Sequence, residues 1–353
     1  MIKVLIAEDS PVMQELLIHA ISSDPIFDIV GVAWNGEEAV VAVKQLKPDI
    51  VAMDWQMPKL DGREATRIIM ETTPTPIVIV TGSSAADDLV FSFSMIEAGA
   101  IAIVKKPPSP NHPDYVKDKE ELILTLKLMS EVKMVKRISN PSKEIIKQRN
   151  SHEIISSLGS EIDIIAIGAS TGGPQALKTI LSNLPKTLEV PILIVQHISS
   201  GFTLGLAEWL GNTTGFLVNI ASHGEYAKPG IVYIAPDNLH MGIETGRKIV
   251  LSNHVLENGS RPSVGHLFRT VAQEYGSRAI AVLLTGMGHD GASELKQLRD
   301  KGAITFAQDK ESSVVFGMPG EAIKLNGALH ILNPEEISLT IASILNKKKG
   351  VNK

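Results

Sequence analysis

Short apolar runs that alternate with helical patterns constrain the fold of this chain more than any other feature of its sequence. The first runs are Val4–Ala7, Ile29–Val32, Ile50–Met53, Ile77–Val80 and Ile101–Val104. The stretches with helical spacing between them are Pro11–Ile21, Gly36–Leu46, Gly62–Met70 and Ala86–Ala98. Fully apolar strands separated by helices are typical of a parallel sheet with both faces covered. We therefore expect an α/β domain at the start of the chain.

The same alternation resumes after a turn-rich break at residues 107–113 and a polar Lys/Ser/Asn stretch. The later strand candidates are Ile162–Ile167, Pro191–Gln196, Ile231–Ala235, Ile249–Leu251, Ala279–Thr285 and Ala303–Ala307. The later helix candidates are Gln175–Ser182, Val264–Tyr275, Ala292–Lys301 and Pro334–Lys347. A chain of 353 residues also exceeds the size at which one core usually stops growing. We predict two doubly wound, mostly parallel α/β domains, at 1–125 and 161–347, with a linker at 126–160 whose first part is helical.

Composition and charge narrow the class of protein. The chain has no cysteine, which excludes disulfides and thiolate chemistry. No apolar run approaches the roughly 20 residues that span a bilayer, and acidic residues at positions 8 and 9 come too early for a signal sequence. We expect a cytoplasmic protein without membrane insertion. Residues 161–353 carry 17 basic and 17 acidic side chains, which disfavours a nucleic-acid-binding output.

Polar side chains follow four of the first five predicted strands. Glu8 and Asp9 end the first strand, Asp54 the third, Thr81 the fourth and Lys106 the fifth. The carboxyl ends of parallel strands meet at one edge of the sheet, so these groups should converge there. Three carboxylates this close would repel one another strongly unless a cation or a proton intervened, and Mg²⁺, which prefers such oxygen ligands, would resolve the conflict. The same ion would neutralise a phosphoryl group on Asp54, with Lys106 and the Thr81 hydroxyl binding its oxygens.

With Met57-Pro58 and Asp61-Gly62 after Asp54, residues 1–125 resemble a response-regulator receiver domain, which has a flavodoxin-like fold. The resemblance implies that Asp54 is the phosphorylation site and that Glu8, Asp9 and Asp54 hold Mg²⁺. The family often has two aspartates where this chain has Glu8 and Asp9. Asp9 is then the expected direct ligand, and Lys105 is expected to be a bystander.

A second set of chemical groups begins with Gly168-Ala169-Ser170-Thr171-Gly172-Gly173-Pro174, between a predicted strand and a predicted helix. Glycines permit a tight strand-to-helix turn, and the turn would expose Ser170 near backbone N–H groups. A glycine-rich turn of this kind could equally cradle a phosphate.

A histidine and an aspartate follow two other predicted strands of the same domain. His197 could serve as the base for Ser170, and Asp290 could orient the His197 ring. His289 is a rival base, although its adjacency to Asp290 makes the geometry awkward. The backbone N–H near Met287 could stabilise an oxyanion.

The motifs around these residues resemble the catalytic domain of the chemotaxis protein-glutamate methylesterase family, which we expect to be Rossmann-like. The matching segments are residues 168–174, 196–197, 234–236, 261–264, 285–292 and 313–319. The resemblance places the triad on Ser170, His197 and Asp290. His240 and Arg261 are candidates to line the cleft or to serve structure. One departure is Gly265, since an acidic residue is expected after Arg261-Pro262-Ser263-Val264.

The resemblance implies hydrolysis of glutamyl methyl esters on methyl-accepting chemotaxis receptors, with release of methanol and with no cofactor for that step. Some members also deamidate receptor glutamines, and the sequence leaves that activity open. The phosphodonor would be the chemotaxis histidine kinase, and the unphosphorylated receiver would obstruct the esterase cleft. The rival hypothesis is a receiver joined to a non-catalytic module whose residues 168–173 bind a phosphate or nucleotide.

Overall fold

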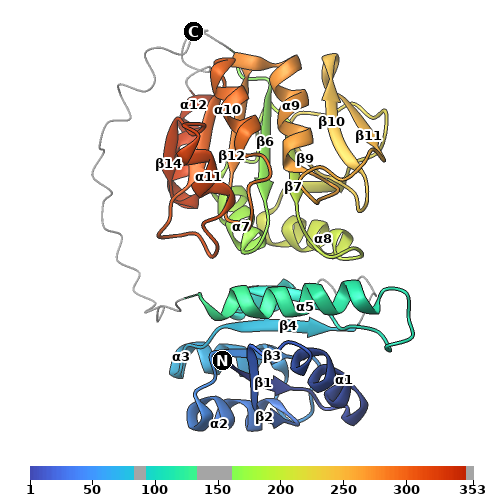
Figure 1. Ribbon diagram of the computed structural model, residues 1–353. Coiled ribbons are helices and arrows are strands. Elements are labelled where there is room, and N and C mark those ends of the chain that lie inside the picture. Colours follow the sequence, from blue (N-terminus) through green and yellow to red (C-terminus); the bar gives the residue numbers. More distant parts are fainter. Residues whose placement is uncertain (83–92, 133–160, 347–353) are drawn as a thin grey trace. The chain divides into compact units, whose positions relative to one another are not determined.

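The computed structural model describes residues 1–82, 93–132 and 161–346, and the chain divides into two compact units, Met1–Pro141 and Ser142–Lys353 (Figure 1). The predicted linker, 126–160, falls largely outside the described residues, and its boundaries stay a prediction. Helix α5 (Tyr115–Ser130) continues past residue 125 and packs on strands of the first unit.

The first unit is a parallel five-stranded sheet in the order β2-β1-β3-β4-β5. Its strands are β1 (Ile2–Ala7), β2 (Phe27–Ala33), β3 (Ile50–Met53), β4 (Ile77–Thr81) and β5 (Ala102–Lys105). Its named helices are α1 (Pro11–Ser22), α2 (Gly36–Leu46), α3 (Gly62–Thr72) and α5. The predicted helix Ala86–Ala98 is described only over residues 93–98, which are helical. This strand order is that of flavodoxin-like folds, as predicted.

The helix starts of the first unit follow local side-chain chemistry. Ser10 caps α1 with Pro11 at the first helical position, and the Asn35 side chain accepts from the Glu38 N–H at the start of α2. Asp61 caps α3 by accepting from the Glu64 N–H at 2.8 Å. Each cap satisfies an N–H that has no partner within the helix. Because these caps define where α1, α2 and α3 begin, they also define where the loops between the strands and the helices end. The polar residues of those loops therefore lie at one edge of the sheet.

The second unit is built on a parallel seven-stranded sheet in the order β14-β13-β12-β6-β7-β9-β8. Its strands are β6 (Ile164–Ala169), β7 (Ile192–Gln196), β8 (Leu217–Ile220), β9 (Ile231–Ile234), β12 (Ala279–Leu283), β13 (Ile304–Gln308) and β14 (His330–Leu332). An antiparallel pair, β10 (His240–Glu244) and β11 (Lys248–Ser252), stands apart from this sheet. Its α-helices are α7 (Gly173–Asn183), α8 (Thr203–Thr214), α9 (Val264–Glu274), α10 (Ala292–Asp300), α11 (Met318–Lys324) and α12 (Pro334–Asn346).

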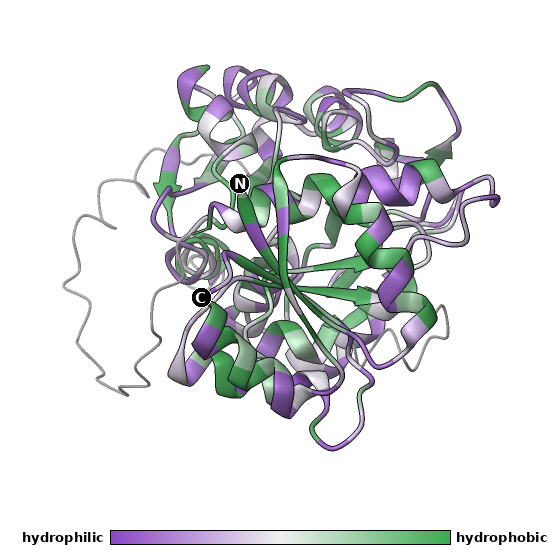
Figure 2. Cartoon of the chain, turned by 60° about the horizontal axis from the view of Figure 1, so that its bottom comes forward, coloured by the Kyte–Doolittle hydropathy of each residue, from purple (hydrophilic) through white to green (hydrophobic). Residues whose placement is uncertain are grey.

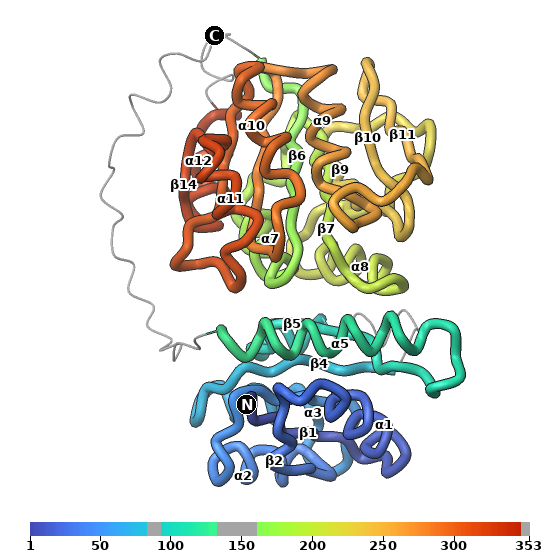
Figure 3. Tube along the Cα trace, viewed as in Figure 1, coloured from blue at the N-terminus to red at the C-terminus, as the bar shows by residue number. Residues whose placement is uncertain are grey.

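Two helical layers enclose the second sheet, with α7, α8 and α12 packed together in one and α9, α10 and α11 in the other (Figure 3). The central strands are buried on both faces, and Figure 2 colours them mainly as hydrophobic whereas the helices alternate between hydrophobic and hydrophilic residues. This pattern confirms the predicted doubly wound α/β class. Strand order reverses between β6 and β12, and such switch points are where ligands bind in open α/β sheets.

Five elements of the second unit were not predicted, namely β8, β10, β14, α8 and α11. The edge strands β8 and β14 are only partly buried, so they lack the apolar run that marks a central strand. Helix α8 exposes one stripe, and because this stripe carries the apolar Leu204 beside Glu208 and Asn212, the sequence lacks a clear polar face. Among the described residues, no helix combines the length and apolar content that crossing a membrane requires.

Candidate active site

Ser170 lies immediately after β6, at the switch point of the seven-stranded sheet. Its N–H donates to the Thr285 carbonyl at 3.0 Å, which ties the end of β6 to the segment after β12. Gly172 has φ +79°, where a Cβ would lie 2.6 Å from Val314 Cβ and Cγ2, so the tight turn into α7 requires glycine. The half-buried Ser170 side chain is thus held on a sharp strand-to-helix turn.

His197 follows β7, the strand beside β6. Its N–H donates to the Ala169 carbonyl at 2.9 Å, so the backbones of the two strand ends are directly paired. The Gln196 side-chain amide adds a second link, since Nε2 donates to the carbonyls of Ser170 at 2.7 Å and His197 at 2.8 Å. Both turns are therefore fixed by contacts to the same neighbouring side chain.

Asp290 accepts from five donors within the described residues. Its Oδ2 accepts from His197 Nε2 at 2.9 Å and from the Val264 N–H at 2.7 Å. Its Oδ1 accepts from three more donors: Asn258 Nδ2 at 3.0 Å, Ser263 Oγ at 2.8 Å and the Gly265 N–H at 3.0 Å. Two of these donors are N–H groups of the first turn of α9, whose positive dipole end favours an anion.

The ionisation of Asp290 follows from these contacts. Its side chain is 3% exposed, and burial by itself would raise its pKa. The hydrogen bond and charge of His197, with the hydrogen bonds from Asn258 and Ser263, outweigh burial and lower the pKa to about 2. Asp290 is therefore a carboxylate at neutral pH and fixes the His197 tautomer with its proton on Nε2.

The nitrogen available for base catalysis is then Nδ1 of His197, because Nε2 is bonded to Asp290. Within the described residues, no hydrogen bond joins the Ser170 hydroxyl to the His197 ring, as is common in catalytic sites without substrate. The rival base His289 is exposed, while Asp290 is paired with His197. The structure thus brings Ser170, His197 and Asp290 to one edge of the sheet, from three adjacent strands.

The backbone of Thr285 and Gly286, just before Met287, lies against Ser170. A Cβ on the neighbouring Gly286 would be 2.7 Å from Ser170 Cβ, so only glycine permits this approach. The Gly286 N–H donates to the Val315 carbonyl at 3.0 Å, whereas the Met287 N–H has no acceptor among the described residues. A donor left open beside a serine is the arrangement that an oxyanion requires.

Three residues of this site were missed by the sequence reasoning: Gln196 as a link between strand ends, and Asn258 and Ser263 as donors to Asp290. Asn258-Gly259 lies at the tip of a tight turn, with both residues at positive φ. Asn-Gly is a recognisable turn signal, and Ser263 precedes a predicted helix as a cap would. The sequence thus indicated their local roles, while their contacts to Asp290 come from the tertiary fold.

The two uncertain cleft residues, His240 and Arg261, contact backbone. His240 is fully buried, with Nδ1 accepting from the Ser263 N–H at 3.2 Å and Nε2 against the Val255 carbonyl at 3.0 Å. Burial lowers the pKa of His240, which keeps the ring neutral. Arg261 Nη1 donates to the carbonyls of Asn253 and His254, at 3.0 and 2.9 Å. Both side chains brace the segment that carries Asn258.

A second polar site lies at the edge of the five-stranded sheet, in the first unit. Lys106 Nζ lies 2.7 Å from Glu8 Oε2 and 3.0 Å from Asp54 Oδ2, and both carboxylates are buried. Burial raises the pKa values of Glu8 and Asp54, and the Lys106 ammonium acts in the opposite direction. The structure therefore brings these three predicted residues together.

The donor set of this second site suits a hard divalent cation. One oxygen from each of Glu8, Asp9 and Asp54 lies within 4.8 Å of the others. Oxygen ligands from carboxylates are those that Mg²⁺ prefers. Thr81 is fully buried at the end of β4, and the Lys106 N–H donates to its carbonyl at 2.8 Å. Lys105 instead points to Asp118, with Nζ 3.7 Å from Oδ2.

Comparisons with known proteins assign a family to each part of the chain. The CheB methylesterase family matches residues 165–341, and the response regulator receiver domain family matches residues 4–112. A Nitrosospira multiformis protein named protein-glutamate methylesterase/protein-glutamine glutaminase is 48% identical over 351 residues, covering 99% of this chain and 98% of its own length. The chain belongs to the CheB methylesterase family.

Two further similarities extend this assignment. A Syntrophus aciditrophicus protein named protein-glutamate methylesterase/protein-glutamine glutaminase 1 is 48% identical over 345 residues, covering 98% of each chain. The crystal structure of the Thermotoga maritima CheB methylesterase catalytic domain is 39% identical, with a TM-score of 0.51, and covers 52% of this chain and all of that domain. Membership in the CheB methylesterase family confirms the resemblance stated from the sequence and disfavours the rival phosphate- or nucleotide-binding module.

Proposed function

We propose that this protein hydrolyses glutamyl methyl esters on chemotaxis receptors, under control of phosphorylation at Asp54. The observation that carries the hydrolase assignment is the bond between His197 and a fully ionised Asp290, at the sheet edge where Ser170 ends β6. The names of the full-length relatives supply the substrate class, glutamyl methyl esters of proteins.

In the proposed reaction, Nδ1 of His197 takes the proton of the Ser170 hydroxyl as its oxygen attacks the ester carbonyl. The Met287 N–H donates to the oxyanion that forms. Collapse breaks the bond to the methoxy oxygen, which leaves as methanol with the proton from His197. Water then attacks the acyl-enzyme, with His197 again accepting the proton, and releases the glutamate carboxylate.

The same steps would convert a receptor glutamine into glutamate, with ammonia leaving in place of methanol. We include this deamidation in the proposal because the relatives' printed names contain protein-glutamine glutaminase. The triad itself requires no cofactor for either reaction, since His197 and Asp290 supply the proton transfers.

The proposed control lies in the receiver. Asp54 accepts the phosphoryl group from a chemotaxis histidine kinase, with Lys106 and the Thr81 hydroxyl on the phosphoryl oxygens. Glu8, Asp9 and Asp54 would hold Mg²⁺, whose positive charge would offset the negative charge of the phosphoryl oxygens. We place the reaction in the cytoplasm, where the kinase and the receptor methylation sites would meet it.

The serine is tested by Ser170→Ala in the full-length chain, with methylated receptor membranes, Mg²⁺ and an acyl phosphate as phosphodonor. We expect methanol release to fall by at least about 10³-fold, because the nucleophile is lost. Thr171→Ala changes a neighbouring hydroxyl and serves as the matched control. Methanol release by Ser170→Ala at the parent rate would disprove the proposed chemistry.

A further inference from the structure

Position 265 is where the family resemblance predicts a carboxylate, and in this chain a different helix supplies one there. Gly265 is the second residue of α9, and its N–H donates to Asp290 Oδ1 at 3.0 Å. A Cβ on Gly265 would lie 3.0 Å from Glu294 Oε2 and 3.1 Å from Asp290 Oδ1. The space that a side chain at 265 would enter is therefore already bordered by the Glu294 carboxylate.

Glu294 belongs to the first turn of α10 and is 7% exposed. Its Oε1 lies 3.6 Å from Arg269 Nη1. Its Oε2 is buried and has no hydrogen-bond partner among the described residues. A buried carboxylate with an unpaired oxygen is costly, so its presence beside Asp290 indicates a role beyond packing.

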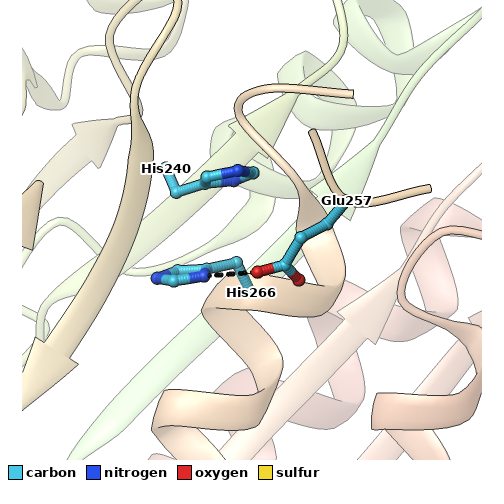
Figure 4. Close-up of side chains that lie close together, drawn as sticks. All are labelled: His240, Glu257 and His266. Carbon is cyan, nitrogen blue, oxygen red and sulfur yellow. Dashed lines mark hydrogen bonds and ion pairs between the residues drawn. The ribbon is translucent and has the colours of Figure 1, made fainter. Parts of the chain in front are cut away.

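The Arg269 guanidinium links Glu294 to a second carboxylate. Arg269 Nη2 donates to Glu257 Oε2, and the other oxygen of Glu257 lies 2.9 Å from His266 Nδ1, as the dashed line in Figure 4 marks. His266 in turn stacks on His240, with ring centroids 4.8 Å apart and 22° between the ring planes.

The three side chains in Figure 4 are close enough together to suggest a metal site, but their geometry does not suit one. The lone pairs of imidazole nitrogens lie in the ring plane. In two stacked rings those directions run side by side and do not converge on one ion. Both nitrogens of His240 also contact backbone groups. We therefore interpret Glu257, His266 and His240 as a structural brace.

The brace ends at the active site. Glu257 and Ser260 exchange backbone hydrogen bonds at 3.1 and 2.9 Å, which closes a turn around Asn258 and Gly259. Asn258 Nδ2 then donates to Asp290 Oδ1 at 3.0 Å. A continuous series of contacts thus joins Glu294 through Arg269 and Glu257 to a donor on Asp290.

We propose that Glu294 is a positioning residue of the hydrolase site. In this proposal, position 265 is glycine because the Glu294 carboxylate takes the role that a carboxylate at position 265 would have. Glu294 holds Arg269, and Arg269 holds the turn whose Asn258 fixes Asp290 behind His197. The proposal rests on the proposed ester hydrolysis for its catalytic readout.

The geometry of α9 predicts that a carboxylate at position 265 can replace the carboxylate at position 294. Residue 265 lies four positions before Arg269 on α9, and side chains at i and i+4 face each other, with the acidic residue first being the favourable order. A carboxylate at 265 could therefore hold Arg269 once Glu294 is removed. With Glu294 present, the added carboxylate would meet two others and raise the energy of the site.

The test compares Gly265→Asp, Glu294→Ala and the double variant in the full-length chain, by methanol release from methylated receptor membranes with Mg²⁺ and an acyl phosphate. Each single variant should lower kcat by about tenfold or more with little change in KM, because Asp290 acts mainly in the transition state. The double variant should recover to within about threefold of the parent chain, which is a coupling that independent sites do not show. Gly265→Asn has the same size without the charge, and should be less impaired than Gly265→Asp.

Thermal unfolding of the parent chain, Gly265→Asp, Glu294→Ala and the double variant separates this proposal from the proposed function. If the parent chain releases no methanol, the function fails, while recovery of the unfolding temperature in the double variant still supports the exchange. If Gly265→Asp folds poorly, recovery of the unfolding temperature in the double variant again tests the exchange. The exchange is overturned if the double variant is as impaired as Gly265→Asp in kcat and in unfolding temperature, or if Glu294→Ala leaves both unchanged.

Discussion

Asp290 carries a buried negative charge of the hydrolase site. A buried carboxylate is normally unfavourable, yet here five donors surround it and two come from the start of α9. Because its pKa is lowered to about 2, below the ordinary value of 3.8, its charged form stabilises the folded state. This contribution is complete above pH about 4 and is lost as the pH falls through about 2.

Asp290→Asn should therefore destabilise the second unit at neutral pH by about 2 kcal/mol, the size that such a pKa difference implies. The gap in the free energy of unfolding between parent and variant should narrow as the pH falls from 4 towards 2, since the parent carboxylate then becomes protonated. Denaturant unfolding at pH 7, 4 and 3 measures it.

The same variant should lower kcat by about 10³-fold or more, because a neutral amide no longer stabilises the charged form of His197. Asp237→Asn is a suitable control, since Asp237 accepts from Gly201 and Thr203 and does not contact His197. A stability gap that stays constant with pH would show that the Asp290 charge does not stabilise the fold.

At the scale of elements, the site depends on how closely α9 approaches the end of β6. A Cβ on Gly168 would lie 2.2 Å from Val264 Cγ1, and Val264 is fully buried. The Val264 N–H is one of the donors to Asp290. The absence of a side chain at 168 thus lets the helix terminus reach the carboxylate.

Gly168→Ala should therefore destabilise the second unit by about 1–3 kcal/mol, the usual cost of overpacking a core. It should also lower kcat, because α9 must move away from Asp290. Calorimetry and methanol release measure the two effects.

Gly211→Ala in α8 is the matched control, since its Cβ would have no neighbour closer than 3.5 Å. That variant should be unchanged or more stable, by up to about 1 kcal/mol. Equal unfolding temperatures for the two variants would contradict the close approach of α9 to β6.

At the scale of the whole molecule, two units of the same α/β architecture carry different chemistry on corresponding edges of their sheets. The receiver edge gathers carboxylates with Lys106, and the hydrolase edge gathers Ser170, His197 and Asp290. A phosphoryl group carries about −1.5 to −2 charges and takes the place of the single negative charge on the Asp54 carboxylate, so the first edge gains about one negative charge. A shift from 1:99 to 99:1 between inactive and active states would need about 5.5 kcal/mol. We expect one phosphate to produce a substantial but incomplete switch.

Asp54→Asn should abolish the response to phosphodonor, because an amide cannot form the acyl phosphate. The ratio of methanol release with and without an acyl phosphate and Mg²⁺ should exceed one in the parent chain and equal one in the variant. Asp61→Asn, which alters a helix cap near the same edge, is the control. A phosphodonor response that persists in Asp54→Asn would place the phosphoryl acceptor elsewhere.

The sequence by itself determined the central strands, the doubly wound class and the residues at the strand ends. It could do so because a fully buried parallel strand is a continuous apolar run, and the residue that follows it lies at a known edge. Glu8, Asp54 and Lys106 meet because each comes directly after a strand. The same reasoning brought Ser170, His197 and Asp290 to one edge, with the family resemblance favouring them over the alternatives.

Only the tertiary structure decided how that edge is held in place. Asn258 contacts Asp290 across 32 residues of sequence, and Glu294 occupies the space beside Gly265 from another helix. Such contacts depend on the path of a loop and on the distance between packed helices, neither of which leaves a periodic pattern in the sequence. From the sequence we interpreted Gly265 as the loss of an expected carboxylate. In the fold, the Glu294 carboxylate borders the space beside Gly265.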